Sequence, residues 1–299
     1  MWILIGLGGA AVLLAAYAVL IERRWYRLRR YRLDILPAGG PLSVLHLSDL
    51  HMLDGEAHKR RFLRDLPRAD VTIVTGDLLG EPEAVEYVVE TLQPLRGRLA
   101  SFFVLGSNDL YAPRLLNPLR YFIPHDRRRG RSGRRGRGGD LVRQLEDDGW
   151  VHLKNRFHGG GLDGTPMEIV GLDDPHIHRG DVTAAPRREP ERFGLAVVHS
   201  PDPVAELVAL GYDLIVTGHT HGGQVRLPWG RALVTNSSIP RSLASGLHRM
   251  GGSFLHVSPG LGTSKFAPFR LFCRPEATLL ELREGGSRGE ASRGAKRRG

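Results

Sequence analysis

Residues 42–51 read Leu-Ser-Val-Leu-His-Leu-Ser-Asp-Leu-His, a short apolar run that ends in polar residues. Such a run is typical of a strand that is buried in a sheet. Comparable runs recur at 71–75, 102–105, 168–170, 195–198, 214–217 and 278–282. Helical stretches alternate with them at 56–66, 82–92, 140–147 and 203–210. This alternation predicts a layered α/β domain in which ligands gather where the strands end.

Residue types that bind metal ions follow several of these strands. They form five polar clusters, namely Asp49-Leu50-His51, Gly76-Asp77, Asn108-Asp109, His199 and Gly218-His219-Thr220-His221. Taken alone, a Gly-Asp pair is usually a turn, and a lone His is usually a hydrogen-bonded structural residue. Five clusters that supply carboxylate, carboxamide and imidazole groups together predict a site for a pair of divalent metal ions.

The spacing inside the clusters indicates how two ions could be shared. Asp49 and His51 are two residues apart, so on an extended strand both side chains would point to the same side and could hold one ion. The carboxylate of Asp77 has two oxygens and could bridge both ions. His219 and His221 repeat the two-residue spacing, and by themselves they could share one ion or serve one each.

The order of these motifs resembles the calcineurin-like metallophosphoesterase superfamily over residues 42–282. The run Gly218–Gln224 is similar to the corresponding motif of the bacterial membrane-associated branch, which includes relatives of UDP-2,3-diacylglucosamine pyrophosphatases. The resemblance implies a four-layer α/β/β/α sandwich of the metallo-dependent phosphatase type. It also implies that Asp49, His51 and His221 hold the first ion, that Asp77 bridges the two ions, and that the second ion is held by His199, His219 and an Asn.

One motif departs from the family pattern, which usually reads Gly-Asn-His-Asp or Gly-Asn-His-Glu. Here residues 106–109 read Gly-Ser-Asn-Asp, so an alignment without a gap puts Ser107 on the metal. A shift by one residue keeps Asn108 on the metal and leaves Asp109 beside the substrate, and we prefer it because a carboxamide oxygen is the better ligand. With either alignment no His stands at the usual proton-donor position. The leaving group would then need little protonation, or another residue such as His125 or His178 would supply the proton.

The expected activity is hydrolysis of a phosphodiester, phosphomonoester or pyrophosphate bond by metal-activated hydroxide. Mixed nitrogen and oxygen ligands suit Mn²⁺, Fe or Zn²⁺ better than Mg²⁺ alone. The substrate is expected to be a phosphoester, with a lipid-linked one favoured by the membrane segment described next. The alternatives are a non-catalytic metal-binding membrane protein, and a phosphodiesterase that acts on nucleic acid or cyclic nucleotides.

The amino terminus has the composition of a membrane helix. Residues 2–21 carry no charge, and twenty residues at about 1.5 Å per residue span a hydrocarbon core of about 30 Å. A cleaved signal peptide is the alternative, but no basic residue precedes the apolar run. Six Arg residues follow it within 23–32, which by the positive-inside rule places the catalytic domain in the cytoplasm of a single-pass cell-membrane protein.

The charge distribution separates a folded domain from basic appendages. The net charge is +10, but the basic residues concentrate at 23–32, 127–137 and 283–298, and the rest of the chain is net acidic. This distribution argues against nucleic-acid binding by the fold, whereas attraction to anionic lipid headgroups explains the same charges. The expected organisation is a membrane anchor at 1–22, a basic juxtamembrane linker at 23–40, the catalytic domain at 41–282 with a flexible loop at 127–139, and a disordered basic tail at 283–299.

The one cysteine, Cys273, excludes an internal disulfide and a cysteine-based zinc site.

Overall fold

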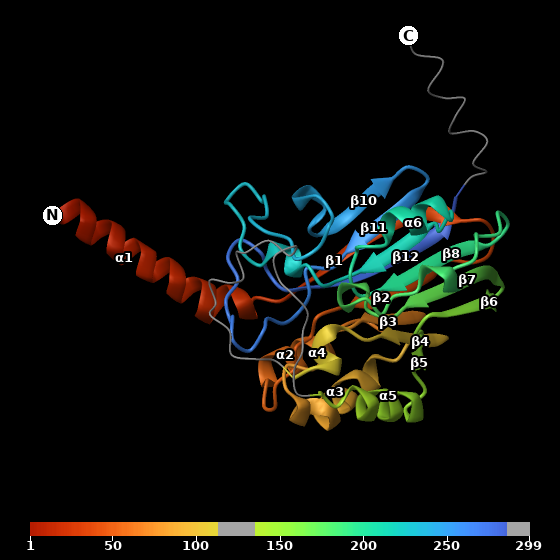
Figure 1. Cartoon of the computed structure of the whole chain (residues 1–299), viewed down its shortest axis with the longest axis horizontal. Coiled ribbons are helices and arrows are strands. Elements are labelled where there is room, and N and C mark those ends of the chain that lie inside the picture. Colours follow the sequence, from red (N-terminus) through yellow and green to blue (C-terminus); the bar gives the residue numbers. More distant parts are fainter. Residues whose placement is uncertain (113–134, 286–299) are drawn as a thin grey trace, which may run out of the picture.

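Two mixed sheets pack face to face in the computed structural model, which describes residues 1–112 and 135–285 (Figure 1). The first has the spatial order β1-β12-β2-β3-β4-β5. Its strands are β1 (Arg27–Leu36), β12 (Glu276–Glu284), β2 (Leu42–Leu47), β3 (Val71–Thr75), β4 (Ala100–Val104) and β5 (Val151–His152). The second has the order β10-β11-β9-β8-β7-β6. Its strands are β10 (Gly246–Met250), β11 (Ser253–Val257), β9 (Leu214–Thr217), β8 (Phe193–Val198), β7 (Thr165–Leu172) and β6 (Arg156–Leu162).

The outer faces of both sheets are covered by helices. The first sheet carries α2 (Ala57–Arg64), α3 (Val85–Leu92) and α5 (Gly138–Asp147), and the second carries α6 (Val204–Ala209) (Figure 1). The inner faces share one apolar cluster, in which Val44 and Ile73 of the first sheet belong with Leu195 and Val216 of the second. Central strands are thus buried on both faces, which is why they read as continuous apolar runs. The predicted four-layer α/β/β/α sandwich is confirmed.

The stretch that we expected to be a juxtamembrane linker is instead an edge strand. β1 pairs in parallel with β12 along its length, so residues 27–36 belong to the first sheet. Arg27 and Arg29 form ion pairs with the buried Glu276, and Arg32 pairs with Glu281. The arginines made this segment look like a solvated linker, because their acidic partners lie far away in the sequence.

Two further boundaries differ from expectation. The glycines Gly138 and Gly139 begin α5 rather than ending a flexible loop, and Arg135 forms a β-bridge with Tyr111. The remainder of the expected loop, up to residue 134, lies outside the described residues. At the carboxyl end, Arg283 and Glu284 belong to β12, and the rest of the expected tail from residue 286 on is likewise outside the described residues.

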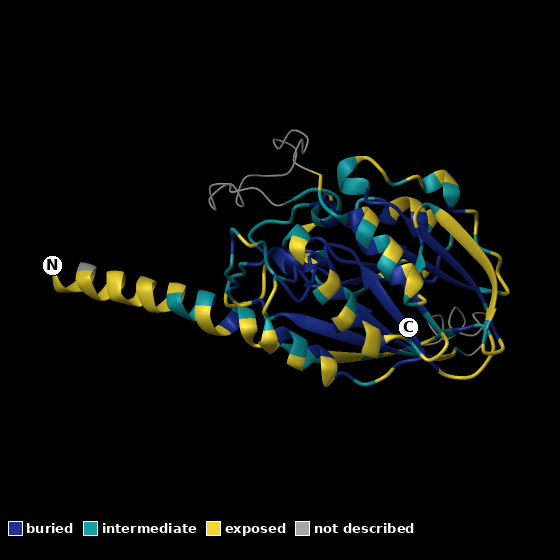
Figure 2. Ribbon diagram, turned by 90° about the horizontal axis from the view of Figure 1, so that it is seen from below, coloured by how far each residue is buried: buried dark blue, intermediate teal, exposed yellow. Residues whose placement is uncertain are grey.

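The apolar amino-terminal run forms one helical rod. It comprises α1 (Trp2–Ala16), a π-helical turn (Tyr17–Ile21) and a 3₁₀ turn (Glu22–Arg24). Residues Ile5–Arg24 are long and apolar enough to cross a membrane. The rod extends away from the sandwich and is exposed over most of its length (Figure 2). This exposed apolar rod is a candidate membrane span.

Candidate metal centre

The five predicted clusters meet at the junction of the two sheets. Asp49 and His51 follow β2, Asp77 follows β3, and the short helix α4 (Ser107–Leu110) follows β4 in the first sheet. His199 follows β8, and the segment that contains His219 and His221 follows β9 in the second sheet. All of these side chains are buried or partly buried. The carboxyl ends of neighbouring parallel strands therefore bring together residues that are up to 172 positions apart in the sequence.

One half of the site contains Asp49, His51, Asp77 and His221. Each offers a ligand atom, and these atoms all lie within 4.8 Å of one another. His51 Nε2 is 3.2 Å from His221 Nε2 and 3.6 Å from Asp77 Oδ2, and His221 Nε2 is 3.5 Å from Asp49 Oδ1. The four groups could hold one metal ion.

The other half lies on the opposite oxygen of Asp77. Asp77 Oδ1 is 3.7 Å from His199 Nε2, which is in turn 3.2 Å from His219 Nδ1. Asn108 spans the two halves, because its backbone N–H donates to Asp77 Oδ1 at 2.8 Å and its side-chain Nδ2 donates to Asp77 Oδ2, the oxygen nearer to His51. His221 lies with His51 and His219 lies with His199, so the two histidines of this segment belong to different halves of the site.

Backbone carbonyls fix the orientation of three of the rings. His199 Nδ1 is 2.6 Å from Thr75 O, His219 Nε2 is 2.9 Å from Asn236 O, and His221 Nδ1 is 3.3 Å from Gly262 O. A carbonyl oxygen can only accept, so these ring nitrogens carry the hydrogen. The other nitrogen faces Asp77 in His199, Asp49 in His221, and the His199 ring in His219. A ring with one nitrogen fixed by a carbonyl and the other directed into the site is the arrangement that metal-binding histidines use.

The electrostatics of the site favour a bound cation. Asp49 Oδ1 is buried without a hydrogen-bond partner, although it lies among ligand-type atoms. Burial, only partly offset by His199, and the neighbouring Asp77 raise the pKa of Asp49 to about 6. Burial alone would lower the pKa of His199, but Asp77, Asp174 and Asp49 raise it to about 9. Several buried carboxylates thus compete for positive charge, and the residues present fit a divalent metal ion.

The candidate ligand residues have an unusual backbone conformation. Five of them have positive φ: Asp49 (48°), His51 (42°), Asp77 (51°), His219 (67°) and His221 (49°). The expectation that Asp49 and His51 lie on an extended strand is therefore wrong, since both adopt the left-handed region just after β2 ends. That region costs roughly 1–2 kcal/mol for a residue with a Cβ, and it persists where the surrounding structure enforces it, typically at functional sites.

Two glycines let the segments that carry the candidate ligands pack closely against one another. A Cβ added to Gly218 would lie 1.8 Å from Ser48 Oγ and 2.4 Å from Asp49 Oδ2. A Cβ on Gly106 would lie 2.3 Å from Asp77 Oδ1. These two positions therefore admit only glycine if the carboxylates are to keep their places.

The altered motif at 106–109 is arranged as follows. Asn108 contacts Asp77 through both its backbone N–H and its side-chain amide, so this carboxamide lies at the place that the one-residue shift requires. Asp109 differs from expectation, because its carboxylate is fully buried and accepts hydrogen bonds from the backbone N–H groups of Leu78, Leu79 and Gly106 at 2.8–2.9 Å. Both oxygens of Asp109 are occupied by the main chain, so it holds the β3 and β4 loops together rather than facing a substrate.

Sequence reasoning missed the segment after β7. Asp174 is buried, with Oδ1 accepting from His176 N at 2.9 Å and Oδ2 without a partner. The ring of His176 lies 4.1 Å from that of His219. His178, which we expected as a proton donor, is exposed, and His125 lies outside the described residues. The signal was available, since Asp173-Asp174-Pro175-His176 is another polar cluster at a strand end, but the strand was expected to end at 170 instead of 172.

Comparison with known proteins agrees with this geometry. The family model described as calcineurin-like phosphoesterase matches residues 42–223. The chain is 27% identical to the uncharacterized metallophosphoesterase YkoQ of Bacillus subtilis, covering 83% of this chain and 86% of that protein. It is 27% identical to the phosphodiesterase YaeI of Escherichia coli, with 87% and 90% covered. It is 25% identical to the UDP-2,3-diacylglucosamine pyrophosphatase LpxG of Chlamydia muridarum, with 80% and 83% covered. The chain belongs to the calcineurin-like phosphoesterase family and is a metal-dependent phosphoric ester hydrolase.

Proposed function

We propose that this hydrolase uses two divalent ions that share Asp77. The first ion would be held by Asp49, His51, His221 and one oxygen of Asp77, and the second by the other oxygen of Asp77, His199, His219 and Asn108. The observation that carries this proposal is that the two oxygens of Asp77 face different histidine pairs, at 3.6 and 3.7 Å. The mixture of imidazole and oxygen ligands suits Mn²⁺, Fe or Zn²⁺.

The protein's own residues would orient the groups that take part in the reaction and set the distances between them. A pair of divalent ions, when bound, supplies Lewis-acid activation of water and of the phosphoryl oxygens. The carbonyls of Thr75, Asn236 and Gly262 hold His199, His219 and His221 in the tautomers that leave the ligand nitrogens free of hydrogen. Ligand geometry that is set before substrate arrives lowers the cost of reorganisation during the reaction.

A proton for the leaving group would come from His176. This half-buried imidazole lies against His219 at the edge of the site, while Asp109 is turned away from it. The Nδ1 atom of His176 is buried, and its backbone N–H is anchored on Asp174. We therefore assign to His176 the role that the sequence offered to His125 or His178.

The substrate class that we favour is a membrane-associated phosphodiester or pyrophosphate. Two observations support it, namely the candidate membrane span that leads directly into the sandwich and the similarity to LpxG, a UDP-2,3-diacylglucosamine pyrophosphatase. The chain would then be a single-pass cell-membrane protein with its catalytic domain in the cytoplasm, because the arginines follow the span. A nucleic-acid or cyclic-nucleotide phosphodiesterase is the competing substrate class.

A substrate screen with the full chain separates these classes. The protein, in uncharged detergent and with added Mn²⁺, Fe²⁺ or Zn²⁺, is assayed on a generic aryl phosphodiester, a lipid-linked pyrophosphate, a cyclic nucleotide and single-stranded DNA. Metal-dependent turnover of the aryl ester tests the chemistry. Preference for the lipid-linked compound by at least an order of magnitude in kcat/KM supports our substrate class, and preference for either nucleotide substrate contradicts it.

A further inference from the structure

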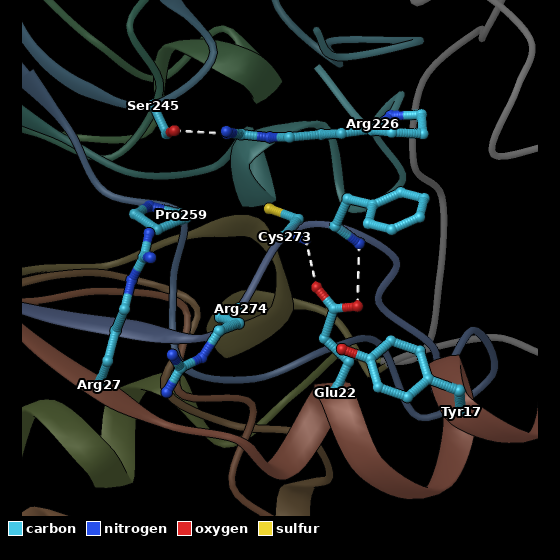
Figure 3. Close-up of a pocket in the computed structure, with 10 residues that line it drawn as sticks. Tyr17, Glu22, Arg27, Arg226, Ser245, Pro259, Cys273 and Arg274 are labelled. Carbon is cyan, nitrogen blue, oxygen red and sulfur yellow. Dashed lines mark hydrogen bonds between the residues drawn. The ribbon is translucent and has the colours of Figure 1, made fainter. Parts of the chain in front are cut away.

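A cavity of about 300 Å³ lies at the foot of the amino-terminal helix, apart from the ligand atoms of the metal centre (Figure 3). Its walls come from the end of the helix, from β1, and from the segments on either side of β10 and β11. The lining residues are Tyr17, Glu22, Arg27, Arg226, Pro228, Ser245, Pro259, Phe272, Cys273 and Arg274. No function described above uses this cavity.

The foot of the helix is fixed to the sandwich. Glu22 is only 2% exposed and accepts hydrogen bonds from the backbone N–H groups of Phe272, at 2.9 Å, and Cys273. The backbone N–H of Arg270 donates to Ala18 O at 3.1 Å, and Arg274 Nε donates to Trp25 O at 2.9 Å. The cavity therefore has a defined position relative to the candidate membrane span, just where residues Ile5–Arg24 end.

The lining is dominated by guanidinium groups. Arg226 lies on the wall opposite Glu22, with Arg27 and Arg274 to one side (Figure 3). Glu22 is the one acid among the described residues that line the cavity, and two backbone amides already engage it. Burial and the neighbouring Arg27 lower the pKa of Arg274, as expected where positive charges crowd together.

These arginines keep unused hydrogen-bond donors. Arg226 uses Nε on Gly222 O and Nη2 on Ser245 Oγ, Arg274 uses Nε and Nη2 on the carbonyls of Trp25 and Tyr26, and Arg27 uses Nε on Glu276. Within residues 1–112 and 135–285, no acceptor is found for Nη1 of any of the three. Fixed guanidinium groups with spare donors are the usual means of binding phosphate oxygens.

We propose that this cavity binds the phosphate of an anionic phospholipid headgroup through Arg27, Arg226 and Arg274. The inference rests on the membrane association proposed above. Trp25, 52% exposed, lies with its ring centre 4.0 Å from the Arg274 guanidinium, and Phe272, which lines the cavity, is 42% exposed. Aromatic residues of this kind mark the headgroup level of a bilayer, where a phosphate would enter from the side of the helix. A free phosphate ester offers the same chemistry, and the experiment must separate the two sources.

The cavity also shares a wall with the metal centre. Cys273 Sγ donates to His221 O at 3.3 Å, and Arg226 Nε donates to Gly222 O at 2.6 Å. The backbone of the segment that bears His221 is thus supported from the cavity side. A headgroup bound there would hold this edge of the enzyme at the membrane surface while leaving the ligand nitrogens to the metal.

The test measures binding of short-chain lipids to the full chain in uncharged detergent, without metal. Dihexanoyl phosphatidylglycerol and dihexanoyl phosphatidylcholine are titrated below their micelle concentrations, with the fluorescence of the protein as the signal. Arg27→Gln and Arg274→Gln each remove one proposed phosphate donor. Arg24→Gln is the matched control, because it removes one charge beside the same membrane segment and Arg24 does not line the cavity.

The proposal expects saturable binding of phosphatidylglycerol in preference to phosphatidylcholine. Each cavity variant should raise the dissociation constant about tenfold, whereas Arg24→Gln should change it by less than about twofold. Equal binding of the two lipids, or equal effects of all three variants, would overturn it. If glycerol phosphate displaces phosphatidylglycerol when the two are at equal concentrations, the ligand is a soluble phosphate ester and the lipid assignment fails.

Folding and catalysis are kept separate from this result. The melting temperature of each variant without lipid shows whether it folds. Arg274 also donates to the carbonyls of Trp25 and Tyr26, so Arg274→Gln could fail to fold. In that case Arg27→Gln provides the test. Because no metal or hydrolysis enters the assay, absence of lipid binding would leave the phosphoesterase function standing. An inactive enzyme that still binds phosphatidylglycerol selectively would contradict the catalytic proposal and leave this one intact.

Discussion

The carboxylate of Asp77 lies 3.7 Å from the imidazole of His199, across the junction between the two sheets. Asp77 follows β3 of the first sheet, and His199 follows β8 of the second. The contact depends on the packing of the two sheets as well as on the local sequence of either strand. Metal affinity should therefore depend on how the two sheets pack against each other. Changes that separate the sheets should reduce metal affinity before they unfold the chain.

Gly218→Ala should abolish metal binding, because the new Cβ would overlap Ser48 Oγ and Asp49 Oδ2. Overpacking of this kind typically destabilises a protein by about 1–3 kcal/mol, and here the strain falls on Asp49, a proposed ligand. Gly252→Ala is the matched control, since nothing lies within 4 Å of a Cβ at that position. Metal content and urea unfolding check the prediction, and equal metal content in the two variants would refute it.

Asp109→Asn should lower the stability of the fold without changing the shape of the pH–rate profile. The amide replaces one carboxylate oxygen with a donor that faces a backbone N–H, and the lost hydrogen bond costs about 1–3 kcal/mol. Denaturant unfolding measures the stability, and kcat against pH measures the profile. Loss of one ionisation from the profile would restore Asp109 as a catalytic group.

His176→Gln should lower kcat for substrates with poor leaving groups far more than for aryl esters, because only the former need a proton. General acid catalysis contributes typically 10²- to 10⁴-fold. His178→Gln should leave both rates within about twofold, since that side chain is exposed to solvent. The comparison of an alkyl with an aryl phosphodiester provides the readout, and equal losses on both substrates would argue for a structural role.

Asp202 should make the fold sensitive to acid. Burial would raise its pKa, but hydrogen bonds from Ser200, Ser238 and Ser237 hold the pKa of Asp202 at about 2. A carboxylate whose pKa is lower in the folded than in the unfolded chain stabilises the fold above pH 4 or so, and this contribution is lost as the pH falls toward 2.

The difference in unfolding free energy between the native chain and Asp202→Asn should accordingly be present at pH 7 and shrink below about pH 4. Denaturant titrations at several pH values measure it. Asp202 fixes the segment next to Asn236, whose carbonyl orients His219, so the variant should also weaken metal binding. A stability difference that does not change between pH 7 and 3 would contradict this assignment.

The sequence predicts the central strands well and the edges poorly. β2, β3 and β9 are found at the expected residues, because strands buried on both faces read as apolar runs without reference to their partners. β1 was missed because several of its arginines pair with Glu276 and Glu281, about 250 positions away. An edge strand that depends on distant partners has no local signal that separates it from a basic linker.

The candidate site could be predicted in its residue types more than in its geometry. The clusters at strand ends identified Asp49, Asp77 and His199, and the structure brings them together. The pairing of His219 and His221 with different partners depends on left-handed residues and on carbonyls from distant loops, as with Gly262 and Asn236. Such contacts are set by the packing of the whole domain and leave no trace in the spacing of the ligands.

The most direct test of the shared carboxylate is the metal content and turnover of Asp77→Asn beside Asp65→Asn, an exposed control at the end of α2. Both variants are reconstituted with Mn²⁺, analysed for bound metal per chain, and assayed on an aryl phosphodiester. Our account predicts that the native chain and Asp65→Asn bind two ions and hydrolyse the ester, whereas Asp77→Asn loses at least one ion and its activity. An Asp77→Asn protein that retains two ions and native turnover would contradict it.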